Sequence, residues 1–293
     1  MLAFLAVKKS AYDYKKDQAK LDREAEEFLH RKSRRLENMI KSHEEQEASV
    51  GIIKTALDVL KWEYSVMDSE GVAEDLYLYE KKPDLVIAAG GDGTVLRTAQ
   101  YLKEEQLLGV RTDSRSIGYL CGVKDPEHLK KALEGLGSLP RQKLNRLEFL
   151  LDGKQVNNPY LFDEYSIPLL ALNEGLYCNE NPAMSNQYEI LLDGVVHEYK
   201  SSGLIIATAT GSTGIIAKYR GEKMNLSDDR IQYVPRSAPH EKPKYADSLT
   251  VRNNTHGTVL IPDGSREMIT VPEDSVLTAR KGLALTMVGR IRD

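Results

Sequence analysis

The first half of the chain alternates short apolar runs with helical patterns. Residues 2–7, 62–67, 84–89 and 107–110 are apolar runs of strand length. Segments with helical character, 95–102 and 126–136, follow the last two of them, and the glycines and the proline at 135–140 are stop signals. Strands that alternate with helices are typical of a parallel sheet covered by helices, so this half is predicted to be an α/β layer.

The segment 15–47 carries many charged residues, with apolar residues spaced three, four and seven apart. They are Leu21, Ala25, Phe28, Leu29, Leu36, Met39 and Ile40. This spacing predicts one or two amphipathic helices that pack on the body of the protein or on a second subunit. Residues 50–60 form a further helix candidate.

After Pro140 the pattern changes to short alternating segments at 146–151, 188–192, 204–207, 257–261 and 283–288. They are separated by the turn signals Asp152-Gly153, Asp193-Gly194 and Asp263-Gly264. We therefore predict two domains, an α/β domain over 1–139 and a β-rich domain over 140–293. The chain has no low-complexity linker, so the two halves are expected to pack closely, with a cleft between them.

The composition excludes several classes of protein. The chain has 293 residues, of which 41% are hydrophobic and 29% charged, and its net charge is −4. This charge gives no general attraction to nucleic acid or to an acidic membrane, and no apolar run is long enough to span a bilayer. The six histidines and the two cysteines, Cys121 and Cys178, show no metal-ligand spacing, so no metal site made by the protein alone is expected.

The apolar segment 2–7 is too short for the core of a signal peptide and no basic region precedes it. A first strand explains it better. We expect a cytoplasmic protein, with the mitochondrial matrix as the alternative if a transit peptide precedes this sequence.

The strongest local motif is Gly90-Gly91-Asp92-Gly93-Thr94, where a predicted strand gives way to a helix. Glycines there let the backbone approach a ligand closely, and the positive end of the helix favours phosphate. Asp92 would repel an anion, so it makes sense as a base that takes a proton from an attacking hydroxyl, or as a partner of magnesium. The alternative is a tight turn in which Asp92 only caps the helix.

Two further motifs follow. The segment Thr208-Ala209-Thr210-Gly211-Ser212-Thr213-Gly214 comes after a predicted strand and offers hydroxyls and backbone N–H groups suited to a sugar or a phosphate. The pair Asn173-Glu174 could read a ribose diol or an adenine edge, although such a pair is also common on ordinary surfaces. Each motif is weak alone, and together they indicate a nucleotide.

In this order, Gly90–Thr94, Asn173-Glu174 and Thr208–Thr213 resemble the NAD kinase family. More closely, the chain resembles the mitochondrial-type NAD kinases and the plant NADH kinases. Stretches that carry this similarity are 86–94 (VIAAGGDGT), 109–113 (GVRTD), 171–174 (ALNE), 188–193 (YEILLD) and 200–204 (KSSGL), followed by Asp263-Gly264-Ser265. The similarity extends over residues 3–288.

The resemblance implies a Rossmann-like α/β amino-terminal domain, of the kind shared by NAD kinases and diacylglycerol kinases, and a β-rich NAD-binding carboxyl-terminal domain. It implies that ATP with Mg²⁺ phosphorylates the 2′-hydroxyl of the adenosine ribose of NAD, or of NADH, and that Asp92 is the general base. The nucleotide-binding residues that it implies are Gly90, Gly91, Gly93, Thr94, Arg97, Asn173, Glu174, Lys200, Thr208, Thr210, Gly211, Ser212 and Thr213. It also implies a homodimer or homotetramer, since the family often builds the NAD pocket across subunits.

Three positions depart from the family's common pattern. Ser202 stands where an aspartate is common, Arg111 where an asparagine is frequent, and Tyr119 where a histidine is usual. The positive charge of Arg111 could alter which dinucleotide is preferred, or could simply pair with Asp113. The sequence does not choose between these.

Other functions compete with this interpretation. A dinucleotide-binding regulator without catalysis would keep the pocket, and binding of NAD without turnover would reveal it. A lipid kinase of the diacylglycerol or sphingosine type shares the glycine-aspartate loop, but the chain shows no membrane-binding face. A sugar kinase of the phosphofructokinase type and a hydrolase triad built on Ser212 have less support.

Overall fold

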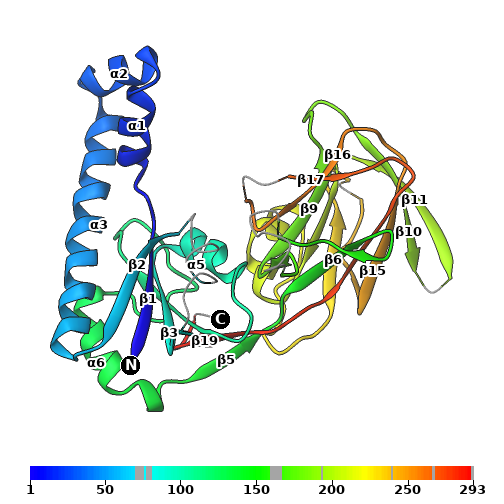
Figure 1. Ribbon diagram of the computed structural model, residues 1–293. Coiled ribbons are helices and arrows are strands. Elements are labelled where there is room, and N and C mark those ends of the chain that lie inside the picture. The colour runs from blue at the N-terminus through cyan, green and yellow to red at the C-terminus, as the bar shows by residue number, and fades with distance from the viewer. Residues whose placement is uncertain are drawn as a thin grey trace. The chain divides into compact units, whose positions relative to one another are not determined.

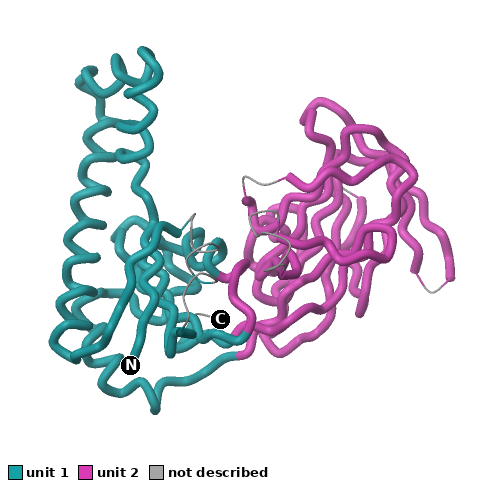
Figure 2. Tube along the Cα trace, viewed as in Figure 1, with its two compact units in different colours: residues 1–98, 104–142, 286–292 teal, residues 99–103, 143–285, 293 magenta. Residues whose placement is uncertain are grey.

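The structure, a computed structural model, describes residues 1–69, 76, 81–158, 167–192, 194–238, 240–265 and 268–291. The chain forms two compact units (Figure 2). Unit 1 comprises residues 1–98, 104–142 and 286–292, and unit 2 comprises residues 99–103 and 143–285. Each unit is described here by itself.

The described part of unit 1 contains a six-stranded sheet in the order β2-β1-β3-β4-β19-β5 (Figure 1). Its strands are β1 (Leu2–Val7), β2 (Glu63–Asp68), β3 (Leu85–Gly90), β4 (Gln106–Arg111), β5 (Arg141–Leu144) and β19 (Leu285–Val288). The pairs β1–β2, β1–β3, β3–β4 and β4–β19 are all parallel. The strand segments predicted from the apolar runs of the first half are confirmed, and β3 is buried along its whole length.

The charged segment near the amino terminus forms α1 (Ala11–Ala19), α2 (Arg23–His30) and the long α3 (Arg34–Val59). Each begins at a side-chain cap: Ser10, Asp22 and Ser33 accept a hydrogen bond from a backbone N–H of the first turn. The sequence separated a helix over 50–60 from the charged helices before it. This was wrong, because no proline or turn interrupts the pattern and α3 continues through Gly51 to Val59.

The core of unit 1 lies between the sheet and the helices α3 and α6 (Leu129–Glu134). Strand residues such as Leu5, Ile87 and Leu108 pack against Ile53 and Leu57 of α3. Burial of such side chains stabilises the layer by about 1.5–3 kcal/mol each. The amino-terminal half of α3 extends beyond this core, where α1 and α2 pack beside it (Figure 1).

The sheet of unit 1 places the glycine-aspartate motif at a characteristic position. From β1 the chain moves to β2 on one side and then to β3 on the other, so the order of strands reverses at the pair β1–β3. Ligands of open α/β sheets bind outside the carboxyl ends of the strands at such a point. β3 ends at Gly90 and α5 (Asp92–Ala99) begins two residues later, so the motif lies at this edge.

Unit 2 is built from antiparallel strands. Its described residues form one sheet in the order β11-β10-β15-β18-β6-β7, with β8 paired to β6, and a second in the order β14-β13-β12-β9-β16-β17. The first contains β6 (Leu147–Leu151), β7 (Lys154–Gln155), β8 (Leu170–Ala171), β10 (Asn186–Leu192), β11 (Val195–Ser201), β15 (Ser248–Asn253) and β18 (Val276–Lys281). The second contains β9 (Glu174–Asn179), β12 (Leu204–Ala207), β13 (Ile231–Pro235), β14 (Lys244–Ala246), β16 (Thr258–Pro262) and β17 (Ile269–Val271).

Side chains from both sheets form one core in unit 2. Phe149 of the first sheet and Tyr177 and Ile206 of the second belong to it, and all three are fully buried. Two sheets that share a core form a sandwich. The predicted β-rich character of the second half is confirmed.

The assignment of the last strand to the second half was wrong. The sequence grouped 283–288 with the β-rich segments, yet β19 pairs in parallel with β4 in the sheet of unit 1. The physical reason is that β4 has a free edge there, which a returning strand satisfies. Spacing along the chain carries no information about this return.

Two of the three predicted Asp-Gly turns lie wholly within the described residues. Asp152 and Gly153, the two residues between β6 and β7, both have positive φ, as a two-residue hairpin turn requires. Asp263 and Gly264, which follow β16, also have positive φ. Asp193 lies outside the described residues. No helix in the described part of the chain is long and apolar enough to cross a bilayer.

Candidate functional site

The motif Gly90–Thr94 joins a buried strand to a helix. The turn is closed by hydrogen bonds from the N–H groups of Thr94 and Val95 to the carbonyl oxygen of Gly91, at 3.0 and 3.2 Å. Asp92 and Gly93 therefore lie in the first turn of α5, where N–H groups point outward and a negative ligand is favoured.

The three positions in this loop that are glycine differ in what a side chain there would meet. A Cβ atom on Gly90 would lie 2.0 Å from Oγ1 of Thr94, and one on Gly91 would lie 2.3 Å from Oγ of Ser116. Around Gly93 no atom lies within 4 Å of such a Cβ. None of the three has a positive φ. The sequence attributed all three to backbone turning and ligand approach, but Gly90 and Gly91 make room for protein side chains, and only Gly93 is open.

Asp92 is partly exposed and is held by a segment remote in sequence. Its Oδ1 accepts a hydrogen bond of 2.7 Å from the backbone N–H of Leu120. Among the described residues, Oδ2 has no hydrogen-bond partner. One oxygen thus fixes the carboxylate, and the other is available to accept a proton from a substrate.

Arg111 does not pair with Asp113. Its Nε donates to the carbonyl oxygen of Lys124 at 2.9 Å and its Nη1 to that of Ser116 at 3.3 Å. Asp113 instead accepts from Arg115 and from Oγ of Ser42. Burial of the Asp113 carboxyl works against ionisation, but these hydrogen bonds lower its pKa to about 2.

In unit 2 the second and third motifs lie side by side. β9 and β12 are antiparallel neighbours, and their register sets Glu174 opposite Ala207. Thr208 follows directly: its N–H donates to the carbonyl oxygen of Asn173 at 2.9 Å, and its Oγ1 donates to that of Leu172 at 2.6 Å. Sheet register therefore brings together two motifs that are separated by more than thirty residues.

The Thr208–Gly214 loop packs tightly on the Asn173-Glu174 pair. A Cβ atom on Gly211 would lie 2.0 Å from the carbonyl oxygen of Asn173, and one on Gly214 would lie 3.1 Å from Oε2 of Glu174. The N–H of Gly211 donates to Oγ1 of Thr208 at 3.1 Å. Only glycine fits at 211, because the obstacle is backbone and cannot move aside.

Asp263 holds this pair from a third element, the turn after β16. Its carboxylate accepts hydrogen bonds from the N–H groups of Leu172, Asn173 and Glu174, at 2.7, 2.7 and 3.1 Å. Burial raises the pKa of Asp263 to about 6, although these three hydrogen bonds favour its charged form. A carboxylate with three backbone donors fixes the conformation of the Leu172–Glu174 segment.

Glu174 lies in an unusual environment for an acidic side chain. Burial, followed by the negative charge of Asp263, raises its pKa to about 8. Its Oε2 and the Oδ1 of Asn173 are buried and have no hydrogen-bond partner among the described residues. Buried polar atoms are normally satisfied, so these two atoms fit a polar ligand such as a ribose or a base.

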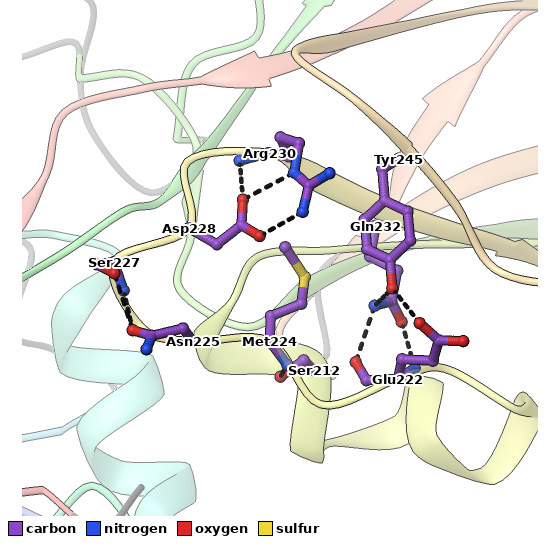
Figure 3. A network of polar contacts seen from close by, with 9 residues as sticks. All are labelled: Ser212, Glu222, Met224, Asn225, Ser227, Asp228, Arg230, Gln232 and Tyr245. Atoms are coloured by element: carbon purple, nitrogen blue, oxygen red, sulfur yellow. Dashed lines mark hydrogen bonds and ion pairs between the residues drawn. The ribbon is translucent and has the colours of Figure 1, made fainter.

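A network of polar contacts includes Ser212 of this loop and continues through the segment after it (Figure 3). Oγ of Ser212 donates to the carbonyl oxygen of Ala209 and accepts from the N–H of Met224, at 2.7 and 3.0 Å. The side chain of Gln232 bonds both backbone groups of Glu222, whose carboxylate accepts from the hydroxyl of Tyr245. Ser212 is thus part of the support of the loop, and its hydroxyl is already engaged within the protein.

The other predicted residues differ in where they lie. Thr210 is buried within the loop, Thr213 is exposed at its end, and Arg97 is half-buried on α5. Lys200 is exposed on β11, in the other sheet of unit 2 from β9 and β12. Among the described residues, no hydrogen bond or ion pair joins the Lys200 side chain to Asn173, Glu174 or the Thr208–Gly214 loop, so its part in the site stays a prediction.

The structure also shows the surroundings of the two other residues that depart from the family's common pattern. Ser202 hydrogen-bonds Oγ of Ser237 at 2.7 Å, and Tyr119 is exposed. Two functional contacts were missed from the sequence: Asp263, which was interpreted as a turn signal, and the backbone of Leu120. The aspartate could have been suspected from its place in the ordered motifs, whereas a backbone N–H carries no sequence signal.

Comparison with known proteins decides the family. Residues 6–138 match the family described as the ATP-NAD kinase N-terminal domain. This match places residues 6–138 in the NAD kinase family. The resemblance inferred from the motifs is confirmed at this level.

A curated relative supports the same assignment. An NAD kinase of Methanospirillum hungatei is 33% identical over 165 residues, which is 55% of each chain. This chain therefore spans about half the length of that NAD kinase.

Two solved structures of the family share the fold. An NAD kinase from Archaeoglobus fulgidus in complex with ATP is 19% identical, with a TM-score of 0.67 over 98% of this chain and 93% of that one. Yeast NADH kinase complexed with NADH is 18% identical, with a TM-score of 0.69 over 99% and 83%. The NAD kinase fold predicted from the motifs, an α/β amino-terminal part and a β-rich carboxyl-terminal part, is thus confirmed over nearly the whole chain.

Proposed function

We propose that this chain is an NAD kinase that transfers the γ-phosphate of ATP to the 2′-hydroxyl of the adenosine ribose of NAD. The observation that carries the proposal is Asp92, at the phosphate-binding edge of the sheet, with Oδ1 fixed by Leu120 and Oδ2 open to a substrate. Membership of the family and the neighbouring structures, which bind ATP and NADH, support it.

In the proposed reaction, Oδ2 of Asp92 takes the proton of the 2′-hydroxyl as that oxygen attacks the γ-phosphorus. A bond forms from the ribose oxygen to phosphorus, the bond to the β-phosphate oxygen breaks, and ADP leaves. Phosphoryl transfer depends mostly on position and electrostatics, so a carboxylate held in a fixed orientation is sufficient. The open backbone at Gly93 and the first turn of α5 offer N–H groups to the phosphates.

The second unit would recognise the nucleoside parts of the substrate. Asn173 and Glu174 each keep a buried oxygen without a partner among the described residues. A protonated Glu174 donates one hydrogen bond and accepts another, which matches a ribose hydroxyl. The hydroxyls of Thr210 and Thr213 and the backbone of Gly211 would complete this surface.

Magnesium would accompany the phosphates of ATP, where it neutralises charge that develops on the transferred group. Among the residues that the structure describes, no three His, Cys, Asp or Glu side chains lie close enough to hold a metal ion. The described residues would therefore suit a magnesium ion that is bound mainly by the phosphates of ATP. Asp92 would be the acidic side chain beside it at the phosphate loop.

The test is an assay of NADP with purified protein, NAD, ATP and Mg²⁺, in which an NADP-specific dehydrogenase measures the product. Asp92→Asn, which keeps the size and the hydrogen bond from Leu120, is assayed beside the wild type. We expect NADP from the wild type and a loss of about 10²–10⁴-fold in kcat for the variant.

Two outcomes contradict the proposal. Absence of NADP from the wild type, with NADH and polyphosphate also tried, together with thermal stabilisation by NAD, would show a dinucleotide-binding regulator. A fully active Asp92→Asn would remove Asp92 as the base while leaving the kinase activity.

Use of NADH as an alternative acceptor, kinship with the mitochondrial-type branch and a homodimer or homotetramer belong to the same proposal. Kinetics with both dinucleotides and light scattering would test the first and the last. A cytoplasmic location is proposed, with the mitochondrial matrix as its alternative, and cell fractionation tests it.

A further inference from the structure

The segment that follows β4, residues 112–122, folds back onto the loop Gly90–Thr94; we call it the return segment. Its first residue, Thr112, donates from its N–H to the carbonyl oxygen of Gly90 at 3.2 Å. Ser116 fills the space above Gly91, where its Oγ lies 2.3 Å from the position of a Cβ. Leu120 donates its N–H to Asp92. The orientation of the Asp92 carboxylate is therefore set by the return segment as much as by α5.

The side chain of Arg111 fastens this segment from the end of β4. Nη1 binds the carbonyl oxygen of Ser116 and Nε binds that of Lys124, beyond the other end of the segment. The aliphatic part of Arg111 lies beneath Gly118, where a Cβ would be 3.1 Å from Cδ. Gly118 has a φ of 63°, a conformation that glycine adopts without strain, so the backbone can pass this close.

From this geometry we infer that Arg111 is a positioning residue that holds the Ser116–Leu120 stretch and thereby orients the Asp92 carboxylate. The inference rests on the proposed function for its catalytic consequence, but the contacts can be tested without activity. Of the two roles left open by the sequence, pairing with Asp113 is wrong, because Asp113 is paired with Arg115. An effect of Arg111 on the preferred dinucleotide stays a prediction.

Arginine suits this task better than the other residues of similar size. A guanidinium presents several N–H donors in a fixed plane and can bind two carbonyl oxygens in different directions, whereas the lysine ammonium is a compact point charge on a flexible stem. An asparagine is too short to span from the end of β4 to both Ser116 and Lys124 in the way that Nη1 and Nε do.

Arg111 also acts through its charge, in addition to its hydrogen bonds. Cys121 follows Leu120 directly and its thiol is buried. Burial, followed by the negative charge of Asp92, raises the pKa of this thiol to about 12. The positive charges of Lys124 and Arg111 oppose the rise. Arg111, Lys124 and Asp92 therefore share one electrostatic neighbourhood. Removal of Arg111 would remove a positive charge from the surroundings of the proposed base.

Arg115 provides a matched control. It lies on the same return segment and is also bound through its guanidinium, to Asp113 and to the carbonyl oxygen of Asn38. Among the described residues, its side chain makes no hydrogen bond or ion pair with Ser116–Leu120. Loss of Arg115 therefore removes an arginine and an ion pair from the same segment but leaves the contacts of Arg111 in place.

The experiment compares Arg111→Ala, Arg111→Lys and Arg115→Ala with the wild type by amide hydrogen exchange and by steady-state kinetics. For Arg111→Ala we expect exchange at Leu120 to rise about tenfold or more, with the Leu85–Ala89 strand unchanged. We expect kcat to fall by about ten- to a hundredfold with KM for ATP and NAD within about twofold, because orientation and not binding is lost. Added guanidinium should restore part of the kcat of Arg111→Ala, and Arg115→Ala should behave as the wild type.

Unchanged exchange at Leu120 in Arg111→Ala, or an equal loss in Arg115→Ala, would overturn the inference. If Arg111→Ala loses protection throughout unit 1, Arg111→Lys is judged by the same criteria, since it keeps the charge and the aliphatic stem. Failure of the proposed function can be told apart from failure of this inference. If the wild type makes no NADP, the hydrogen-exchange comparison at Leu120 still tests whether Arg111 holds the return segment.

Discussion

The two glycine loops look alike in sequence but are built differently. In the loop Gly90–Thr94 the side chains of Thr94 and Ser116 occupy the space beside two glycines, the third glycine is open, and Asp92 is partly exposed. In the Thr208–Gly214 loop the glycine Gly211 meets backbone, and the neighbouring carboxyl of Glu174 is buried beside Asp263.

The difference bears on chemistry. A partly exposed carboxylate with one fixed oxygen suits proton transfer, whereas a buried acid that keeps its proton suits hydrogen bonding to a neutral hydroxyl. The same residue types thus serve two roles because burial differs. Substitutions in each loop and its surroundings separate the two roles.

Gly211→Ala should destabilise the protein by about 3 kcal/mol or more, because the new Cβ meets the carbonyl oxygen of Asn173 and the backbone must shift. Thermal or urea unfolding measures this loss. Gly137→Ala is the control, since no atom lies within 4 Å of its Cβ. Equal stability of the two variants would show that the loop does not pack on Asn173 as described.

Glu174→Gln should alter the pH dependence of stability. The folded pKa of about 8 lies above the ordinary value of 4.5, so the folded state keeps a proton that the unfolded chain has lost. Unfolding free energy should therefore fall as pH rises from about 4.5 to 8, and Asp263, with a pKa of about 6, acts in the same direction.

The variant cannot ionise, so it should gain several kcal/mol over the wild type at pH 9, at about 1.4 kcal/mol per pKa unit, and little at pH 4. Urea unfolding across this range measures the gain. Glu273→Gln, at an exposed residue, is the control. Asp263 should leave a smaller slope in Glu174→Gln, so a slope as steep as that of the wild type would mean that Glu174 is already ionised at neutral pH in the folded protein.

Thr208→Val should cost about 1.5 kcal/mol, because the buried Oγ1 both donates to Leu172 and accepts from the N–H of Gly211. Thr208→Ser keeps the hydroxyl and should recover most of this stability. Chemical denaturation of both variants gives the comparison. A loss in Thr208→Ser as large as that in Thr208→Val would mean that the packing of the threonine methyl group contributes as much as the hydrogen bonds of the hydroxyl.

Gly93→Ala should leave stability unchanged or raise it by about 0.5–1 kcal/mol, since the site is helical and open. Activity should nevertheless fall about tenfold if phosphate approaches the backbone there. Melting temperature and kcat measured together separate the two effects. Full activity would show that the open space beside Gly93 is not used by the nucleotide.

Much of the fold could be predicted from hydrophobic patterning. The strands at 2–7, 84–89 and 107–110 and the β-rich second half follow from local spacing, which burial enforces. The return of β19 to the first sheet could not be predicted, because strand pairing depends on which edges are free and not on the strand's own residues.

The candidate site shows the same division. Asp92, Asn173 and Glu174 were found from the sequence because their residue types and their order carry the chemistry. The role of Asp263 was hidden, since an Asp-Gly pair between strands already has an explanation as a turn. Arg111 was left undecided, because only the folded loop shows which carbonyl oxygens its guanidinium reaches.

Most strands of the first half, the β-rich character of the second and the glycine-aspartate motif could be predicted from the sequence alone, because periodicity and motif spacing are local properties. The tertiary structure decided which glycines make room for protein and which are open, which acid keeps its proton, and which backbone N–H fixes the proposed base. These depend on atoms brought together from distant parts of the chain, through sheet register in unit 2 and through the return segment in unit 1.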